Sequence, residues 1–280
     1  MTDDHLHIAF DPAERRARGE RLYREVAQSA PPPADSPLSA SVLDFAMAEV
    51  WSRPGLDRRS RRWIALTCVG AADAEAPIHA ECLAALKSGD ITFPELQEFV
   101  LHFAVYLGWP KASIMEAATR GAYARVLAED GHEGPPPMPP RPLYAGPIDP
   151  ETRFERGREW FNYTVTAPVT PDSPYTHYGI ANFVFGEMWC RPGLDMRARR
   201  LITVAAVGAA DTAVPIASHV YAALNSGDFT YEEMQELVLQ FAVYMGWPKA
   251  SILEQRVRES WAKIQAAGGP VSIPRPAFYP

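Results

Sequence analysis

Cysteine is scarce in this sequence. The chain of 280 residues has three, Cys68, Cys82 and Cys190, and no two of them are spaced as C-x-x-C. Isolated cysteines form neither a disulfide framework nor the thiolate cluster of a structural zinc site. We therefore expect reduced thiols and no metal site.

Positive charge is also in deficit, because the formal net charge is -7. This balance opposes broad binding to a polyanion. The basic cluster that runs from Arg58 to Arg62 is followed directly by an apolar helical pattern instead of aromatic or glycine-rich residues. We expect no nucleic-acid partner.

Long apolar runs are absent as well. No segment is long and apolar enough to span a bilayer, and no basic stretch followed by an apolar stretch follows Met1. We expect a cytoplasmic protein without a membrane partner. With 47% hydrophobic and 22% charged residues, the chain can still bury a full core.

The sequence contains an internal repeat. Aligning Trp51 with Trp189 at a constant offset gives roughly 40 identities over about 66 positions, far more than shared composition produces. A single slip extends the match upstream, where the segment from Asp35 faces the segment from Asp172. We predict two homologous units, residues 1–148 and 149–280.

A proline-rich stretch separates the two units. It contains "PRPLY" from Pro140, and "PRPAF" from Pro274 matches it near the chain end. Because both units carry it, we predict that each closes with an extended surface strap rather than a free polyproline spacer. The junction is expected near 148–151.

Helical spacing of apolar residues runs through each unit, and no stretch shows the alternation of a strand. Pro77 and Pro215 suit the first turn of a helix. Glycine follows each of these helices in "LKSGD" and "LNSGD" as a cap. Two T-x-x-E capping boxes then open the next helices, at Thr92 and Thr230. The fold class predicted is all-α.

The run "FGEMWCRPGLDMRARRLITVAAVGA", a helix with a histidine, and "NSGDFTYEEMQELVLQFAVYMGWPKA" together resemble the carboxymuconolactone decarboxylase family, which is related to the alkylhydroperoxidase D-like proteins. The resemblance covers about two-thirds of the chain. It implies an all-α fold and oligomers of single-domain members. A tandem chain would then be an intrachain pseudo-dimer, and we expect a homo-oligomer of three chains that forms a pseudo-hexamer.

The resemblance also implies where chemistry belongs, and the sequence departs from that pattern. Thr212 and Pro215 stand at the positions of the family's redox cysteines, with Ala74 and Pro77 in the first unit. Disulfide-dependent peroxide reduction is therefore not expected. The family histidine is kept as His219.

The candidate catalytic residues follow from this comparison. His219 has Glu81 as its counterpart in the first unit, and His79 lies two residues before Glu81. Histidine suits proton transfer because its unperturbed pKa is near 6.5. Glu81 and His79 point to different sectors of one helix. Either residue could contact the ligand; alternatively, it lies in solvent or at an interface.

Further residues are candidates for holding the substrate. Arg62 and Arg200 replace the acid that commonly precedes the "LIT" run; they suit a carboxylate or a developing enolate, or form interface ion pairs. The sequence does not establish that Arg200 meets His219. His177, Tyr175 and Tyr178 have no counterparts in the first unit, which makes them candidates for a pocket wall.

Residues shared by both copies favour structural roles. Arg53 and Arg191 are expected to satisfy carbonyl groups at helix ends. The aromatic residues present in both units are expected in the core: Tyr106, Tyr244, Trp109 and Trp247.

The sequence predicts a cofactor-independent, carboxy-lyase-like enzyme. It would act on a small carboxylated or lactone-type metabolite by decarboxylation or by a related proton transfer, such as isomerisation or elimination. The alternative is a catalytically silent oligomeric scaffold or small-molecule binding protein of the same fold. A continuous apolar core around His219 would favour the scaffold, and His219 facing Glu81 or an arginine would favour the enzyme.

Overall fold

The structure is a computed structural model that describes residues 11–132, 149–271 and 273–278. Within these ranges the chain is helical and has no strand, so the prediction of an all-α fold is confirmed. None of the helices described is long and apolar enough to cross a membrane.

The first half of the chain begins with the helices α1 (Pro12–Ala27) and α2 (Pro37–Ser41) and the π-helical η2 (Val42–Trp51). It continues with α3 (Arg58–Ala71), α4 (Glu75–Lys87), α5 (Phe93–Leu107) and α6 (Trp109–Glu129). The second half has α7 (Pro150–Val165), the π-helical η3 (Tyr175–Met188), α8 (Met196–Ala209), α9 (Ala213–Asn225), α10 (Tyr231–Met245) and α11 (Trp247–Ala266).

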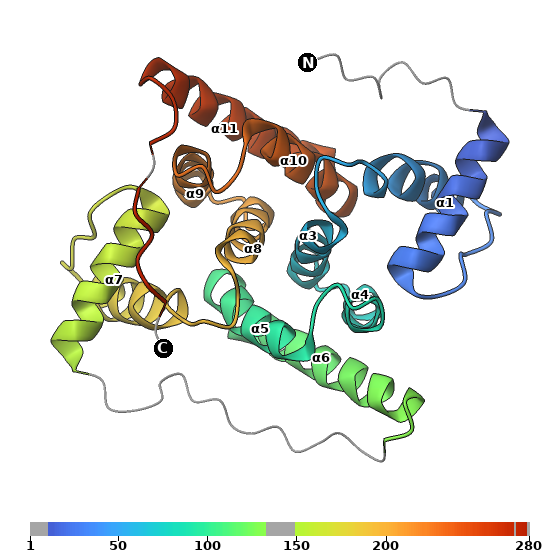
Figure 1. The fold of residues 1–280 in the computed structure, drawn as a ribbon, viewed down its shortest axis with the longest axis horizontal. Coiled ribbons are helices and arrows are strands. Elements are labelled where there is room, and N and C mark those ends of the chain that lie inside the picture. Colours follow the sequence, from blue (N-terminus) through green and yellow to red (C-terminus); the bar gives the residue numbers. More distant parts are fainter. Residues whose placement is uncertain (1–10, 133–148, 272, 279–280) are drawn as a thin grey trace.

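The four central helices α9, α8, α3 and α4 stand in a row, with α10 and α11 along one side and α5 and α6 along the other (Figure 1). α3 packs against α8 where the two halves meet. One core cluster contains buried side chains from both halves, including Trp63, Phe103, Leu201 and Phe241. The two halves therefore share a core.

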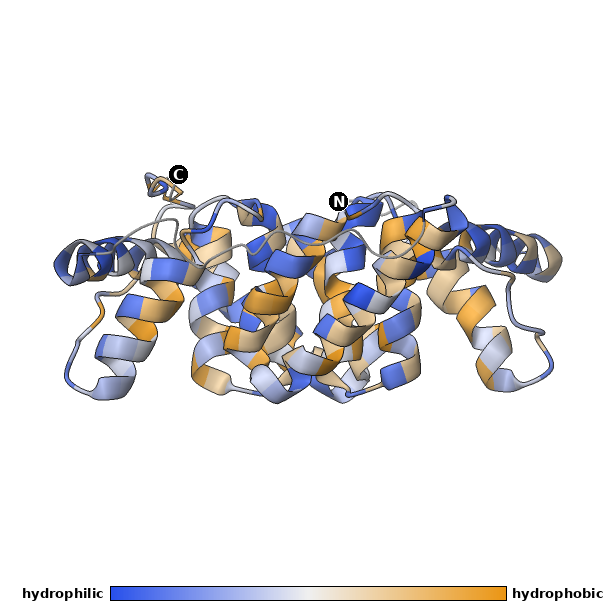
Figure 2. Ribbon diagram, turned by 90° about the horizontal axis from the view of Figure 1, so that it is seen from below, coloured by the Kyte–Doolittle hydropathy of each residue, from blue (hydrophilic) through white to orange (hydrophobic). Residues whose placement is uncertain are grey.

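The outer ends of the molecule repeat one arrangement. α1 packs on η2 at one end, and α7 packs on η3 at the other. α1 and α7 are mostly hydrophilic, whereas hydrophobic residues gather on the helices between them (Figure 2). Each contact is close: a Cβ added at Gly19 would lie 1.9 Å from the Leu43 carbonyl oxygen, and one at Gly157 would lie 1.8 Å from that of Ala181.

Local signals placed the helices correctly. The capping boxes at Thr92 and Thr230 form, and Pro77 and Pro215 lie in the first turns of α4 and α9. Gly89 and Gly227 follow those helices with φ of 71° and 75°. The paired helices have similar lengths, with 14 residues in both α3 and α8 and 13 in both α4 and α9. These lengths agree with two homologous units, and the division of the chain stays an interpretation of the repeat.

Of the two predicted straps, the one from Pro140 lies outside the described residues. The one from Pro274 passes along α7, and its Phe278 ring lies 5.2 Å from the Trp160 ring. The prediction of core positions for Trp109 and Trp247 is wrong, since they are 59% and 57% exposed. Each opens a helix directly after a glycine cap, and its ring lies near a phenylalanine of the opposite half, Phe183 at 5.9 Å from Trp109 and Phe45 at 6.1 Å from Trp247.

Candidate functional site

His219 lies within a cluster that we call the second-half cluster: Trp189, Arg200, His219 and Asp228, with Tyr106 from the first half. α9 places the imidazole, which is 6% exposed, between two aromatic rings. It stacks on Trp189 at 6.5 Å between centroids and meets Tyr106 edge-on at 5.5 Å. Its Nδ1 has no hydrogen-bond partner among the described residues. The site thus holds a buried nitrogen with an unused hydrogen-bonding position.

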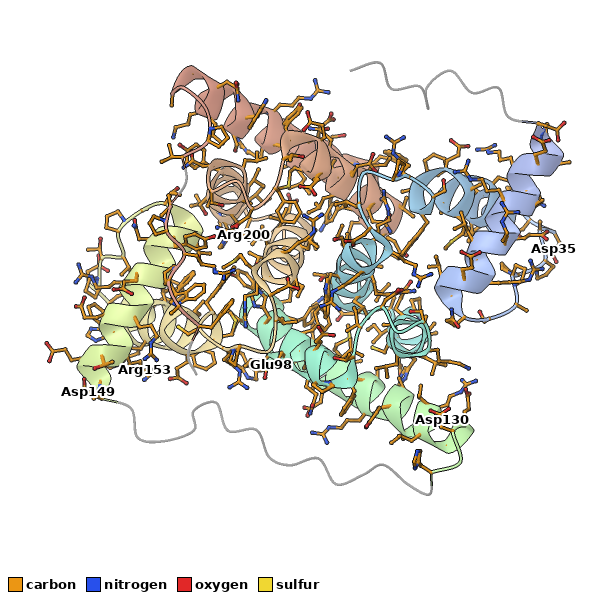
Figure 3. The ribbon with its side chains drawn as sticks, viewed as in Figure 1. Asp35, Glu98, Asp130, Asp149, Arg153 and Arg200 are labelled. Carbon is orange, nitrogen blue, oxygen red and sulfur yellow. The ribbon has the colours of Figure 1, made fainter. Side chains whose placement is uncertain are left out.

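Arg200, which Figure 3 labels, extends from α8 and donates to a backbone carbonyl group of α7. The guanidinium is fully buried and donates to Asp228 Oδ2 at 3.0 Å. It also donates to the backbone carbonyl groups of Thr164 and Tyr163. The Tyr163 hydroxyl donates to the same aspartate at 3.0 Å. One carboxylate therefore balances the one positive charge of the cluster.

The environment of His219 keeps the imidazole neutral. Burial, followed by the positive charge of Arg200, lowers the pKa of His219 to about 3. Near neutral pH the ring therefore offers one donor and one acceptor nitrogen rather than an imidazolium charge. A protonated form requires an added negative charge nearby.

Tyr106 reaches the cluster from α5. Its hydroxyl accepts a hydrogen bond from Trp189 Nε1 at 3.0 Å. Burial raises the pKa of Tyr106 to about 12, against the opposing hydrogen bonds of Thr203 and Trp189. The phenol thus keeps its proton at neutral pH, and its oxygen is positioned by groups from the second half.

A second buried histidine supports this tyrosine. His102 is fully buried, with Nε2 at 2.8 Å from Thr203 Oγ1 and Nδ1 at 3.2 Å from a nitrogen of Arg199. Because arginine only donates, Nδ1 accepts and Nε2 carries the proton that is donated to Thr203. Burial, and then the positive charge of Arg199, hold the pKa of His102 well below its ordinary value.

The corresponding position in the first half differs. We call the set Trp51, Arg62, Glu81, Asp90 and Tyr244 the first-half cluster. Arg62 is fully buried and donates to Glu81 Oε2 at 2.6 Å and to Asp90 at 3.3 Å. The Tyr244 hydroxyl, from the second half, donates to Glu81 Oε1 at 3.2 Å. An ion pair thus occupies the position that His219 has in the second half.

The structure separates several residues that the sequence had suggested as one site. Glu81 and His219 lie in different clusters, so they do not face each other. His79 is exposed on α4. His177 stacks on Tyr178 and Phe154 at the start of η3, and Tyr178 is 68% exposed. These contacts do not join His177 or Tyr178 to His219, and their predicted role in substrate binding stays a prediction.

Arg53 and Arg191 join the two halves of the chain. Both form ion pairs with a glutamate of the opposite half, Arg53 with Glu236 at 2.6 Å and Arg191 with Glu98 at 2.6 Å. Glu98 lies on α5 beside the loop that follows η3 (Figure 3). The arginine that both copies share therefore pairs across the boundary between the halves, and its predicted bonds to carbonyl groups at helix ends stay a prediction.

Sequence reasoning missed Tyr106, His102 and Thr203 as parts of the site. The repeat contains a signal for two of them, because the two copies differ at these positions. His102 aligns with Gln240, and Thr203 aligns with Ala65, within otherwise similar helices. Tyr106 gives no such signal because Tyr244 matches it. Its function as a cross-half contact follows only from the packing of α5 beside α8.

The described residues include neither a cluster that could bind a metal ion nor a pair of cysteines bonded to each other. No group of three His, Cys, Asp or Glu side chains converges there. The three cysteines are buried and unpaired with one another. Burial raises the pKa of Cys82 and Cys190 to about 12 and also raises that of Cys68. These thiols stay protonated at neutral pH.

Comparison with known proteins finds a family match in the second half of the chain. The carboxymuconolactone decarboxylase family matches residues 174–254, which include Trp189, Arg200, His219 and Asp228. Over this range the chain is similar to the carboxymuconolactone decarboxylase family. The second-half cluster thus lies within the family's own region of the chain, apart from Tyr106.

Two relatives of this family carry decarboxylase names. The chain is 36% identical to the 4-carboxymuconolactone decarboxylase of Acinetobacter baylyi over 88 residues, which are 31% of this chain and 65% of that protein. It is 29% identical to the nitrosuccinic acid decarboxylase npaB of Metarhizium robertsii over 136 residues, which are 44% of this chain and 94% of that protein. At the level of the family, these relatives support a decarboxylase-type function.

Proposed function

We propose that the chain is a cofactor-independent enzyme that decarboxylates a small carboxylated or lactone-type metabolite, with His219 as the proton-transfer residue. The observation that carries the proposal is the buried, neutral imidazole with an unpartnered Nδ1 beside a fully buried arginine. Buried titratable groups with strongly shifted pKa values are concentrated at functional sites. The names of the two relatives support the reaction class.

Charge balance indicates how the histidine works. Arg200 is already neutralised by Asp228, so a substrate carboxylate would add one uncompensated negative charge to a buried cluster. Such a charge favours protonation of the adjacent imidazole. Substrate binding would thus place one proton on His219, which is neutral in the free enzyme.

The reaction consumes that proton. The bond between the carboxylate and the substrate's α-carbon breaks, carbon dioxide leaves, and the electron pair passes into a conjugated carbonyl to give an enolate. His219 then delivers its proton to carbon, so that RCOO⁻ and H⁺ become RH and CO₂ and the imidazole is neutral again. General acid catalysis of this type contributes about 10²–10⁴-fold to the rate.

Tyr106 would support the same step. Its oxygen is held by Trp189, and its proton is retained because its pKa is about 12. A positioned neutral phenol stabilises a developing enolate by donating a hydrogen bond. Isomerisation or elimination would use the same groups, since these reactions also pass through an enolate.

The alternative function is a catalytically silent binding protein or scaffold. The observation that favours it is the close aromatic packing of His219, whose ring stacks on Trp189. The buried charges of Arg200 and Asp228 argue against a purely apolar core.

The test is turnover by purified protein with a panel of carboxylated lactones and β-keto or vinylogous acids, followed by carbon dioxide release and product mass. His219→Gln keeps an amide in place of the imidazole but transfers no proton at working pH, so we expect turnover to fall by about 10²–10⁴-fold. His132→Ala removes an exposed imidazole and serves as the control. Equal turnover by His219→Gln and wild type would refute the role of His219.

A further inference from the structure

The first-half and second-half clusters each contain a buried arginine at the same position of the repeat. Arg62 and Arg200 are both fully buried, and both bond a backbone carbonyl of an outer helix, Val26 in α1 and Thr164 in α7. Each also bonds an aspartate, Asp90 or Asp228. The two clusters therefore share an arginine site with the same attachment to the fold.

The difference is one carboxylate. In the first half, Glu81 accepts hydrogen bonds from both the guanidinium of Arg62 and the hydroxyl of Tyr244. In the second half, the matching position is His219, which supplies no acceptor to Arg200 among the hydrogen bonds of the described residues. Tyr106 is the counterpart of Tyr244, and its ring still faces this position.

A second observation points to a ligand in the second half. His219 Nδ1 is buried without a hydrogen-bond partner in the part of the chain that the structure describes, and the residue is 6% exposed. A buried polar nitrogen without a hydrogen bond is costly, by about 1–3 kcal/mol in general, unless something binds it. The first-half cluster also contains a buried nitrogen without a partner among the described residues, Arg62 Nε, but at Glu81 both carboxylate oxygens are bonded.

We infer that Glu81 is a resident carboxylate, which fills in the first half the anion site that the second half leaves for the carboxylate of a ligand. The chain then has one ligand site, formed by Arg200, His219 and Tyr106, and the first-half cluster is its self-occupied counterpart. The ligand class, a small monocarboxylate, rests on the proposed function. The occupation of the first site by Glu81 rests on geometry alone.

The experiment measures the melting temperature in sodium formate and sodium acetate against sodium chloride of equal ionic strength. Glu81→Ala leaves Arg62 with an empty carboxylate position, and Glu81 is 17% exposed, so a small anion can reach it. We expect this variant to lose roughly 5 °C or more in chloride and to regain about half of the loss near 0.1 M formate. Glu81→Gln fills the same space and should show no such gain.

His219→Glu is the complementary variant, because it supplies to Arg200 the carboxylate that Arg62 already has. The carboxylate-specific gain in melting temperature should then be largest for Glu81→Ala, smaller for wild type and absent for His219→Glu. Equal gains in all three proteins, or a gain in His219→Glu as large as in wild type, would overturn the inference.

The experiment contains two independent comparisons, so one of them still tests the inference if a variant of the other does not fold. Glu81→Ala against Glu81→Gln tests the first-half site, and wild type against His219→Glu tests the second. The result is also independent of catalysis: a preparation without turnover on any substrate can still show the predicted order, and a His219-dependent enzyme can fail to show it.

Discussion

At the scale of the residue, the neutral state of His219 is the property on which stability and the proposed chemistry both depend. The imidazole lies between Trp189 and Tyr106, with the charge of Arg200 nearby, so the folded protein resists protonating it. The unfolded chain has no such resistance, because its histidines titrate near pH 6.5. Acid should therefore weaken the fold through this residue.

The sign and the range follow from the two pKa values. Above about pH 6.5 both states are neutral and His219 adds no pH dependence. Between about 6.5 and 3 the unfolded state binds a proton that the folded state does not, so stability falls by up to about 1.4 kcal/mol per pH unit. In His219→Gln we expect a shallower fall by that amount, measured by urea unfolding between pH 7 and 4.

His102 supplies a built-in reference for this measurement. Burial also lowers its pKa well below the ordinary value, so part of the acid sensitivity should remain in His219→Gln. Identical slopes in wild type and variant would mean that His219 is protonated normally in the folded protein. The proposed charge balance would then fail as well.

Comparison with a family and with the other copy singled out His219 and the arginines, which the structure places in buried clusters. Their roles stay predictions. Tyr106 was not singled out, because it contributes to the second-half cluster from α5, more than 80 residues before Trp189, and both copies carry a tyrosine there. Pairing across the halves depends on how the helices pack, which local spacing does not record.

At the scale of the element, α1 and α7 matter because their backbone carbonyl groups hold the two buried arginines. Thr164 in α7 accepts from Arg200, and Val26 in α1 accepts from Arg62. A glycine sets the distance of each helix from the next, Gly157 for α7 and Gly19 for α1. Moving either helix therefore moves an arginine.

The matched pair Gly157→Ala and Gly19→Ala tests which arginine the reaction needs. Each added methyl group would meet a backbone oxygen at under 2 Å, so both variants should lose about 1–3 kcal/mol or more of stability. Only Gly157→Ala should also lower turnover at a temperature where both proteins are folded. Equal losses of turnover would assign a catalytic part to the first half.

Element boundaries were largely readable from the sequence, since caps and proline positions act within one helical turn. The capping boxes at Thr92 and Thr230 mark helix starts that the structure reproduces. The exposure of Trp109 and Trp247 was not readable in this way. Each stands at the junction of two helices, where the direction of the side chain is set by the angle of the turn.

At the scale of the whole molecule, the halves are interlocked by polar side chains as well as by the shared core. Glu98 pairs with Arg191 and Glu236 pairs with Arg53, each across the boundary between halves. The Cβ of any residue at Gly193 would lie 2.1 Å from the Glu98 side chain, so the loop closes tightly over it. These contacts lie within one chain. The assembly of three chains into a pseudo-hexamer stays a prediction.

Such interlocking predicts that the two halves unfold together. Neither cluster is complete without a tyrosine of the opposite half, and α3 has its buried neighbours in α8 and α10. Scanning calorimetry should therefore give a single transition whose calorimetric and van't Hoff enthalpies agree. Glu98→Gln removes the carboxylate that pairs with Arg191, so it should lower the free energy of unfolding by about 3–5 kcal/mol. The single transition should move to a lower temperature without splitting. Two separate transitions in wild type, or a split produced by Glu98→Gln alone, would show that each half holds its own fold and that the contacts between them are accessory.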